Sequence, residues 1–195
     1  MTPRDDTPRR KAEARTSARS LRRALTVEQR AEAARAIARR LTDLPELDGV
    51  RAALAYAATP EEADAAPVVE QLRSRGVRVA FPRVCGPGVL ALHWVEADDP
   101  LVSGYCGIRE PADDAPEASA HEIDLVLVPG TAFDEECCRL GMGGGFYDRL
   151  LSRLRPGALA VGLAFDEQLT GPLPREAHDV PLDIVVTPTR TLRRR

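Results

Sequence analysis

The sequence predicts an α/β protein: a three-layer α/β/α domain with a mostly parallel central sheet and an N-terminal helical segment. Short apolar runs alternate along the chain with segments typical of helices, which is the order that builds a layered α/β domain. Residues 50–81 read as a strand, a helix and a second strand, a unit that pairs its two strands in parallel. The run IDLVLVP at 123–129 is continuously apolar, as in strands that are buried on both faces.

A chain of 195 residues can form one domain with a full-sized core, and we expect a single domain over residues 1–195. Residues 1–10 contain two prolines and mostly charged side chains, so we expect them to be disordered. No apolar run approaches the roughly 18–20 residues that cross a bilayer, and the first residues lack the apolar region of a secretory signal. We therefore expect a cytoplasmic protein without membrane contact, and a monomer as its form.

The helical segment comes first in the chain. Residues 11–41 are rich in Ala, Arg, Glu and Leu, which are strong helix formers. Thr26, followed by Glu28 and Gln29, is typical of a cap that starts a second helix after a short break. Four basic residues share one face of the first helix at helical spacing: Lys11, Arg15, Arg19 and Arg22.

The rest of the chain supplies the sheet. The first strand is expected at 50–58, and the helix after it ends at Gly76. Further strands are expected at 77–81, 89–96, 123–129, 158–165 and 184–187, with a helix from Phe146 to Leu154. The stretch 97–121, rich in Pro, Asp and Glu, reads as an irregular excursion.

Charge is distributed unevenly along the chain. Residues 1–40 carry 12 basic and 5 acidic side chains, a balance of +7, and the remainder carries 15 basic and 25 acidic, a balance of −10. This asymmetry indicates an anionic ligand near the N-terminal segment, either nucleic acid or a small polyanion such as ATP. Lys11 is the only lysine among 27 basic residues, which indicates either a position that needs a compact ammonium group or chance survival.

Four glycines fall within five residues, after the strand at 123–129 and before a predicted helix. Each costs on the order of 1 kcal/mol in backbone freedom relative to alanine, so this density is typical of a backbone that wraps closely around a ligand. The helix that begins at Phe146 offers free N–H groups and the positive end of its dipole, and Arg139 adds a full charge. The segment Arg139–Asp148 therefore reads as a phosphate-binding loop, although it matches neither the Walker P-loop nor the dinucleotide pattern.

The four cysteines form no C-x-x-C pair, and the three histidines lie far from them in sequence. A zinc site needs clustered ligands at short spacing, so none is predicted. The adjacent Cys137 and Cys138 read as two reduced thiols in a loop, because a disulfide between neighbouring cysteines closes an awkward ring. A redox-active pair is the alternative.

The stretch IDLVLVPGTAFDEECCRLGMGGGFYDRLL resembles the signature of the 5-formyltetrahydrofolate cyclo-ligase family, whose members are also called methenyltetrahydrofolate synthetases. The likeness extends over most of the chain, with separate motifs in the family's order. These motifs are Lys11-x-x-x-Arg15, the acidic Glu62 after the first strand, Phe81-Pro82-Arg83, Gly107-Ile108-Arg109-Glu110-Pro111 and His178-Asp179-Val180-Pro181-Leu182-Asp183.

The resemblance implies a reaction in which ATP and 5-formyltetrahydrofolate give 5,10-methenyltetrahydrofolate, ADP and phosphate. The formyl oxygen would attack the γ-phosphate, N10 would capture the resulting iminium phosphate, and phosphate would leave. Such chemistry depends on positioning and charge stabilisation more than on a protein nucleophile. The sequence agrees with this demand, because it has no nucleophile elbow and no obvious Ser–His–Asp set.

The resemblance also implies the phosphate-binding residues. Lys11, Arg15 and Arg139 would be the catalytic residues, which hold the ATP phosphates and neutralise charge as the γ-phosphoryl group moves. The loop would cradle the same phosphates with its backbone amides. Its ATP-binding members are Leu140, Gly141, Met142, Gly143, Gly144, Gly145, Phe146 and Tyr147.

Metal and folate ligands follow from the same resemblance. Asp148 and Asp179 would hold Mg²⁺ directly or through water, with a helix-dipole partner and a loop cap as their structural alternatives. Glu62 would hydrogen-bond to the pterin or to the N5/N10 region of the folate. Gly144 and Tyr147 complete the predicted substrate-binding residues.

The sequence departs from the family's pattern at three places. Cys137 stands where the family usually has glycine, and Met142 replaces an aromatic or basic residue inside the loop. Cys106 stands where an aromatic residue often packs on the folate, which weakens the substrate assignment because stacking on a flat ring contributes binding energy. Tyr105 is a candidate replacement, whereas Trp94 reads as a core residue of its strand.

Three other functions compete with this one. An ATP-binding paralogue of the same fold would act on another substrate or have lost folate turnover. A nucleic-acid binder would use the basic N-terminal helix, but no aromatic platform alternates with the basic residues and the acidic remainder would repel a long polyanion. A relative of sugar-phosphate isomerases or CoA-transferases is a third class that the fold alone does not exclude.

Overall fold

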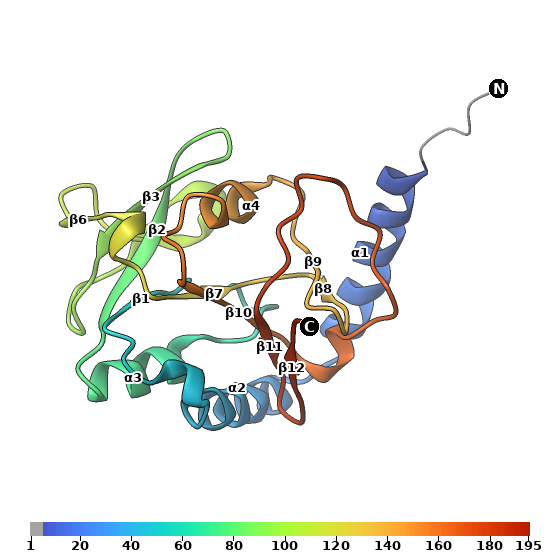
Figure 1. Cartoon of the computed structure of the whole chain (residues 1–195), viewed down its shortest axis with the longest axis horizontal. Coiled ribbons are helices and arrows are strands. Elements are labelled where there is room, and N and C mark those ends of the chain that lie inside the picture. The colour runs from blue at the N-terminus through green and yellow to red at the C-terminus, as the bar shows by residue number, and fades with distance from the viewer. Residues whose placement is uncertain (1–5) are drawn as a thin grey trace.

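An eight-stranded sheet runs through the molecule (Figure 1), which the computed structural model describes over residues 6–195. Its strands are β1 (Ala52–Leu54), β2 (Arg78–Gly86), β3 (Val89–Trp94), β6 (Glu117–Ala118), β7 (Leu125–Val128), β10 (Leu159–Leu163), β11 (Ile184–Val186) and β12 (Thr191–Arg193). Their order is β12-β11-β10-β7-β1-β2-β3-β6. The pairings from β11 through β10, β7 and β1 to β2 are all parallel, and β12, β3 and β6 add antiparallel pairings at the edges. The mostly parallel central sheet predicted from the sequence is confirmed.

The α-helices of the described chain are α1 (Thr7–Arg23), α2 (Val27–Thr42), α3 (Ala66–Ser74) and α4 (Phe146–Leu151). Thr26 caps α2 as predicted, since its side chain accepts the Gln29 N–H and the Gln29 side chain accepts the Thr26 N–H. The expected disorder of residues 1–10 is wrong from Thr7 onwards, while residues 1–5 lie outside the described chain. Pro8 falls in the first turn of α1, where its missing N–H costs nothing and its fixed φ suits a helix.

Helices cover both faces of the sheet. Because successive side chains of a strand point to opposite faces, each strand contributes to both layers. On one face, α2 and α3 pack against the strands through Ile37, Leu41, Val68 and Leu72, which join Ala53, Leu125, Leu127 and Val161 in one core cluster. On the other face, Leu150 and Leu151 of α4 join Leu54, Val126, Val128 and Val185. The three-layer arrangement follows from these two clusters.

Some predicted boundaries differ from the structure. The strand expected at 50–58 ends at Leu54, because the chain leaves the sheet at Tyr56 to line a cavity. The predicted strand at 77–81 continues to Gly86 as one arm of an antiparallel hairpin with β3. Helix α4 ends three residues early, because Arg153 and Leu154 already make tighter i→i−3 bonds ahead of Pro156. Strand β12 was not predicted at all.

Helix α1 lies to one side of the sheet (Figure 1). Its small residues Ala14 and Ala18 pack against Ala132, Leu140 and Leu173. Ala132 and Leu140 belong to a separate two-stranded hairpin, β8 (Ala132–Phe133) and β9 (Arg139–Leu140), that precedes the glycines. This packing brings the N-terminal helix beside the predicted phosphate loop, 120 or so residues further along the chain.

The excursion at 97–121 is largely irregular, as predicted. It contains a short hairpin of β4 (Val102–Ser103) and β5 (Arg109–Glu110), with a 3₁₀ turn at Tyr105–Gly107 between them. None of the helices over residues 6–195 combines the length and the apolar character needed to span a bilayer.

Two aspartates tie neighbouring parallel strands together where the strands begin. Asp124, directly before β7, accepts the N–H groups of Arg51 and Ala52 at 2.7 and 2.9 Å. Asp183, directly before β11, accepts the N–H of Ala160 at 2.9 Å. Each carboxylate thereby accepts backbone N–H groups that have no partner in the sheet, and it supports the register of the neighbouring strand.

We predict that Asp124→Ala lowers the free energy of unfolding by about 1–3 kcal/mol near neutral pH, because two backbone N–H groups lose their acceptor. Burial opposes the charged form of Asp124, but its bonds from Arg51, Arg155 and Ala52 outweigh burial and lower its pKa below the ordinary 3.8. A carboxylate with a depressed pKa in the folded state stabilises the fold above its unfolded-state pKa, and this contribution disappears as pH falls through the folded-state pKa.

Urea unfolding of the wild type and Asp124→Ala at decreasing pH measures this difference, which should shrink once pH falls below the ordinary aspartate value. Asp98→Ala, at an exposed position in the excursion, is the control and should leave unfolding unchanged. A deficit in Asp124→Ala that stays the same at acidic pH would contradict the assignment.

Candidate active site

A cavity of about 440 Å³ lies beyond the carboxyl ends of β1 and β7, beside α1. Ligands of open α/β sheets commonly bind at this edge. Every residue predicted for the site lines the cavity: Lys11, Arg15, Glu62, Asp179 and the continuous run Arg139–Asp148. The structure thus brings the predicted residues together, and their individual roles stay predictions. Of the basic stripe on α1, Arg22 is buried and pairs with Glu61 at 3.0 Å instead of lining the cavity.

The glycine loop, residues 141–145, has a backbone that most side chains would disturb. Gly143 and Gly145 adopt positive φ angles of 107° and 65°, which favour glycine. Gly144 has an ordinary φ, but a Cβ there would lie 2.7 Å from two ring carbons of Phe146. The density of glycine therefore reflects both backbone conformation and close approach.

Two arginines hold the glycine loop through its carbonyl groups. Arg15 donates from Nε to the Gly141 oxygen at 2.8 Å, and Arg149 donates from Nη2 to the Gly144 oxygen at 2.5 Å. Among the described residues, Met142 and Gly143 make no hydrogen bond. The middle of the loop consequently keeps unpaired amides at the cavity, where a ligand can accept them.

Arg139 is a buried cation with unused hydrogen-bonding capacity. It is 8% exposed, and its Nε and Nη2 have no hydrogen-bond partner among the described residues. Nη2 lies 3.2 Å from Oδ1 of Asp148, close enough for an ion pair. The two groups are not oriented for a hydrogen bond, so Nη2 stays without a hydrogen-bond partner. Burial lowers the pKa of Arg139, and Asp148 opposes that shift. Buried donors without partners are rare, so these atoms point to an anionic ligand.

Lys11 is held between two carboxylates on the cavity wall. Its Nζ lies 2.6 Å from Oε2 of Glu176 and 2.6 Å from Oδ2 of Asp179, and its side chain is 6% exposed. Burial opposes the charge on Lys11, but the bonds to Asp179 and Glu176 outweigh it and raise the pKa of Lys11. Burial likewise works to raise the pKa of Asp179, and the bond from Lys11 reverses this and lowers it. We call Lys11, Glu176 and Asp179 the lysine clamp.

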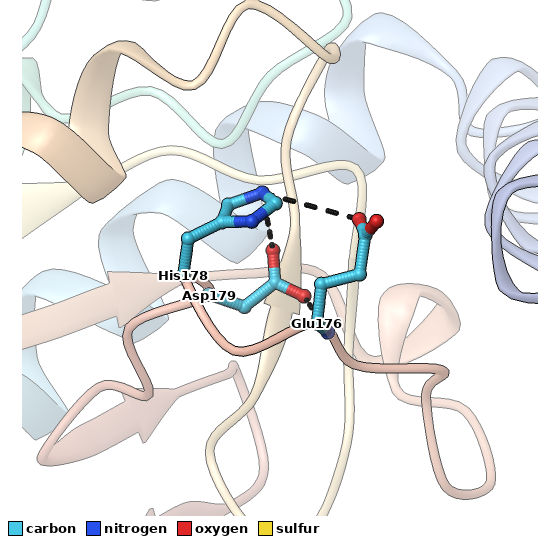
Figure 2. A group of neighbouring side chains, drawn as sticks. All are labelled: Glu176, His178 and Asp179. Atoms are coloured by element: carbon cyan, nitrogen blue, oxygen red, sulfur yellow. Dashed lines mark hydrogen bonds and ion pairs between the residues drawn. The ribbon is translucent and has the colours of Figure 1, made fainter.

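The two carboxylates of the lysine clamp converge with His178 (Figure 2). Asp179 Oδ2 accepts the backbone N–H of Glu176 at 2.7 Å, which fixes the turn that joins them. His178 Nε2 lies 3.9 Å from Glu176 Oε2 and 3.8 Å from Asp179 Oδ1. One ligand atom from each of the three side chains falls within 4.8 Å of the others, a spacing that a single metal ion could bridge.

The predicted metal ligands differ in their surroundings. Asp179 belongs to this cluster, whereas Asp148 pairs with Arg139 and accepts the Val180 N–H at 3.3 Å. Carboxylate oxygens are the protein ligands that Mg²⁺ prefers, so Asp148, Asp179 and Glu176 fit that ion chemically.

Formal charge in the cavity is close to balanced. Its cationic lining is Lys11, Arg15, Arg109 and Arg139, and its carboxylate lining is Glu62, Glu110, Asp148, Glu176 and Asp179. Four positive and five negative charges leave a formal balance of −1. The basic character of the N-terminal segment therefore does not extend into the cavity as a whole.

Tyr105 provides an aromatic surface to the cavity. The residue is 53% exposed, and its ring centroid lies 6.2 Å from that of Phe146, which also lines the cavity. The buried Glu110 accepts the N–H groups of Tyr105 and Val84, both at 3.3 Å, and so fixes the turn against β2. Trp94 is only 7% exposed and belongs to the core, as predicted.

Glu62 and Tyr147 both line the cavity and lie close enough for the charge on Glu62 to act on the tyrosine. Glu62 accepts the Thr59 N–H at 2.9 Å, which orients its carboxylate in the loop after β1. The Tyr147 hydroxyl is buried without a hydrogen-bond partner among the described residues. Burial raises the pKa of Tyr147, and the charge on Glu62 adds to the increase. The hydroxyl is therefore protonated and free to donate to a ligand.

The backbone at Cys137 explains why the family usually has glycine at this position. Cys137 has a φ of 62° and is fully buried, so the position needs the left-handed conformation that glycine adopts readily. Burial raises the pKa of both Cys137 and Cys138 to about 11. All four cysteines are free thiols, which agrees with the interpretation as reduced thiols; a redox role would need an accessible thiolate.

Sequence reasoning missed three residues of the site. Glu176 was not predicted, although its position two residues before His178-Asp179 offered a signal. Arg149 holds the glycine loop from within α4, and Tyr56 lines the cavity where β1 ends. Neither of the last two carries a local pattern that separates it from an ordinary helix or strand residue.

Comparison with known proteins agrees with the motifs over nearly the whole chain. A model of the 5-formyltetrahydrofolate cyclo-ligase family matches residues 7–188. The 5-formyltetrahydrofolate cyclo-ligase of Escherichia coli (strain K12) is 37% identical over 177 residues, 88% of this chain and 97% of that protein. The Mycolicibacterium smegmatis protein of the same name is 34% identical over 188 residues, 94% of this chain and 96% of that protein.

The fold gives the same result independently. The NMR structure of Aquifex aeolicus 5,10-methenyltetrahydrofolate synthetase matches with a TM-score of 0.83 at 33% identity, and the match covers 95% of this chain and 93% of that one. Sequence and fold together show that this chain belongs to the 5-formyltetrahydrofolate cyclo-ligase family.

Proposed function

We propose that this chain is an ATP-dependent 5-formyltetrahydrofolate cyclo-ligase, which converts 5-formyltetrahydrofolate into 5,10-methenyltetrahydrofolate and releases ADP and phosphate. One observation carries the proposal: residues from every motif shared with the family line a single cavity. They are Lys11, Arg15, Glu62, Pro82, Ile108, Glu110, the run Arg139–Asp148, His178 and Asp179. A family member that had changed its chemistry would have no reason to keep all of these motifs around one space.

The phosphate side of the proposed site is the glycine loop with the cations around it. Arg139 offers two unpaired donor atoms inside the protein, and Lys11 and Arg15 line the same wall. Fixed donors of this kind stabilise charge as a γ-phosphoryl group moves to the formyl oxygen, without any protein nucleophile.

The folate side is the wall of Glu62, Tyr147 and Tyr105. The Glu62 carboxylate would accept from N–H groups of the pterin, and the Tyr147 hydroxyl would donate to the substrate at the junction with Gly144. Tyr105 would supply the aromatic surface that Cys106 does not.

Mg²⁺ is the metal proposed for the site, with Asp148 and Asp179 as its protein ligands together with phosphate oxygens. When bound, the ion would neutralise phosphate charge. We also propose a monomer in the cytoplasm that contacts neither nucleic acid nor membrane.

The direct test mixes the purified protein with 5-formyltetrahydrofolate, ATP and Mg²⁺ and follows the near-ultraviolet absorbance of the methenyl product. We expect product only when ATP is present, and a reaction without ATP is the control. A folded protein that binds ATP but forms no product would instead identify the chain as a paralogue with another substrate.

We predict that Gly144→Val abolishes ATP binding while the protein stays folded, because a side chain there displaces Phe146 and reshapes the glycine loop. Gly171→Val is the matched control, at an exposed glycine where a Cβ meets nothing within 4 Å. Calorimetric titration with ATP measures affinity, and circular dichroism checks the fold. Unchanged ATP affinity in Gly144→Val would refute the role of the loop.

We predict that Tyr105→Ala raises KM for 5-formyltetrahydrofolate about fivefold, since an aromatic contact contributes about 1 kcal/mol. KM for ATP should stay close to that of the wild type. Tyr105→Phe keeps the ring and should behave like the wild type, which separates loss of the aromatic surface from loss of the hydroxyl. Equal increases in both KM values for Tyr105→Ala would argue against a folate-side wall.

A further inference from the structure

The lysine clamp presents a conflict for a site that binds nucleotide. Lys11 is a predicted phosphate ligand, yet its ammonium already donates to Glu176 and Asp179 at 2.6 Å each. One positive charge thus faces two negative ones, and the clamp by itself carries a formal balance of −1. A phosphate group that approaches Lys11 meets two carboxylates at the same place.

The rest of the cavity does not remove this conflict. The lining outside the clamp is formally neutral, with three cations and three carboxylates, so the cavity as a whole keeps the −1 of the clamp. Arg139 is partly neutralised by Asp148 at 3.2 Å. Like charges a few ångströms apart in a partly buried site repel strongly, because water screens them poorly. A metal-free nucleotide therefore enters against net negative charge and has to compete with Glu176 and Asp179 for Lys11.

We propose that Glu176 makes nucleotide recognition depend on a divalent cation. With Asp179 it retains the Lys11 ammonium, and a cation held by Asp148 and Asp179 would take Glu176 as a further ligand and so release Lys11 for phosphate. The inference rests on the proposed ATP site and assigns a specificity-determining role to a residue that the motifs left without one. The convergence of the Glu176 and Asp179 oxygens within 4.8 Å gives the arriving cation a place to bind (Figure 2).

The geometry also explains why position 11 is a lysine in a chain whose other basic residues are arginines. An ammonium group on a flexible stem can turn from one set of acceptors to another, and its three donors suit two carboxylates or phosphate oxygens equally. A planar guanidinium paired with both carboxylates would exchange its partners less easily.

The first experiment measures the reactivity of the Lys11 amine in the absence of nucleotide. Because Lys11 is the only lysine, an amine-reactive acylating reagent reports on it alone once peptide mapping has separated the N-terminal amine. Glu176→Gln removes one charge and keeps the shape, so Lys11 should be acylated several times faster than in the wild type. Glu70→Gln, at an exposed position on α3 outside the cavity, is the control and should match the wild type. Equal acylation rates in all three proteins would contradict the proposal that Glu176 retains the Lys11 ammonium.

The second experiment measures the affinity for a non-hydrolysable ATP analogue, adenylyl imidodiphosphate, by calorimetry in excess Mg²⁺ and in EDTA. The wild type and Glu70→Gln should bind far more tightly with Mg²⁺. In Glu176→Gln the ratio of the two affinities should fall by about tenfold or more, because the metal-free nucleotide meets one negative charge fewer. A purely structural effect of the substitution would weaken both conditions together and leave this ratio unchanged.

The outcomes separate the two proposals. If the wild type binds the analogue and Glu176→Gln keeps the wild-type ratio, the role of Glu176 is refuted and the proposed ATP site stands. If the folded wild type binds no analogue with or without Mg²⁺, the ATP site fails and this inference fails with it.

Discussion

The parallel pairing of β7 with β1 on one side and β10 on the other is the constraint on which the remaining structure depends. All four residues of β7 are buried, so both faces of this strand must be covered, by α2 and α3 on one face and α4 on the other. Parallel strands end at the same edge, and the segments after β1 and β7 therefore emerge side by side. Those segments carry Glu62 and the glycine loop, which explains why distant parts of the sequence form one cavity.

The sheet edge alone provides only part of that cavity, and α1 supplies the opposite wall. Ala14 and Ala18 let the helix approach the β8–β9 hairpin closely, since neither has a side chain beyond Cβ. Lys11 and Arg15 lie on the turns beside these alanines and consequently face the loop. The proposed recognition of an anion therefore depends on the docking of α1, a helix that lies outside the central sheet.

Much of this arrangement could be predicted because its signals are local. The apolar run of β7, the cap at Thr26 and the density of glycines each report on neighbouring residues. The pairing in the lysine clamp could not be predicted, since Lys11 and Glu176 are 165 positions apart and only the position of Glu176 beside His178-Asp179 offered a signal. The same holds for β12, which is only three residues long and owes its existence to pairing with β11. The predicted N-terminal boundary was wrong for a different reason: two prolines and mostly charged side chains are typical of disorder, but Pro8 lies in the first turn of α1, where a helix tolerates it.

The guanidinium of Arg149 links the glycine loop to the turn between β2 and β3. It donates to the Gly144 oxygen and, from Nε at 2.9 Å, to the Gly88 oxygen in the turn between β2 and β3. Because β2 and β3 supply Pro82, Val84 and Leu90 to the cavity, one side chain couples the two walls between which the ligands would lie. Gly88 has a φ of 71°, which favours glycine, and a Cβ there would fall on the guanidinium and displace it from its hydrogen bond. The position of the glycine loop is thereby linked through Arg149 to a turn 61 residues before that arginine, so a substitution in the turn that displaces Arg149 would also remove a support of the loop.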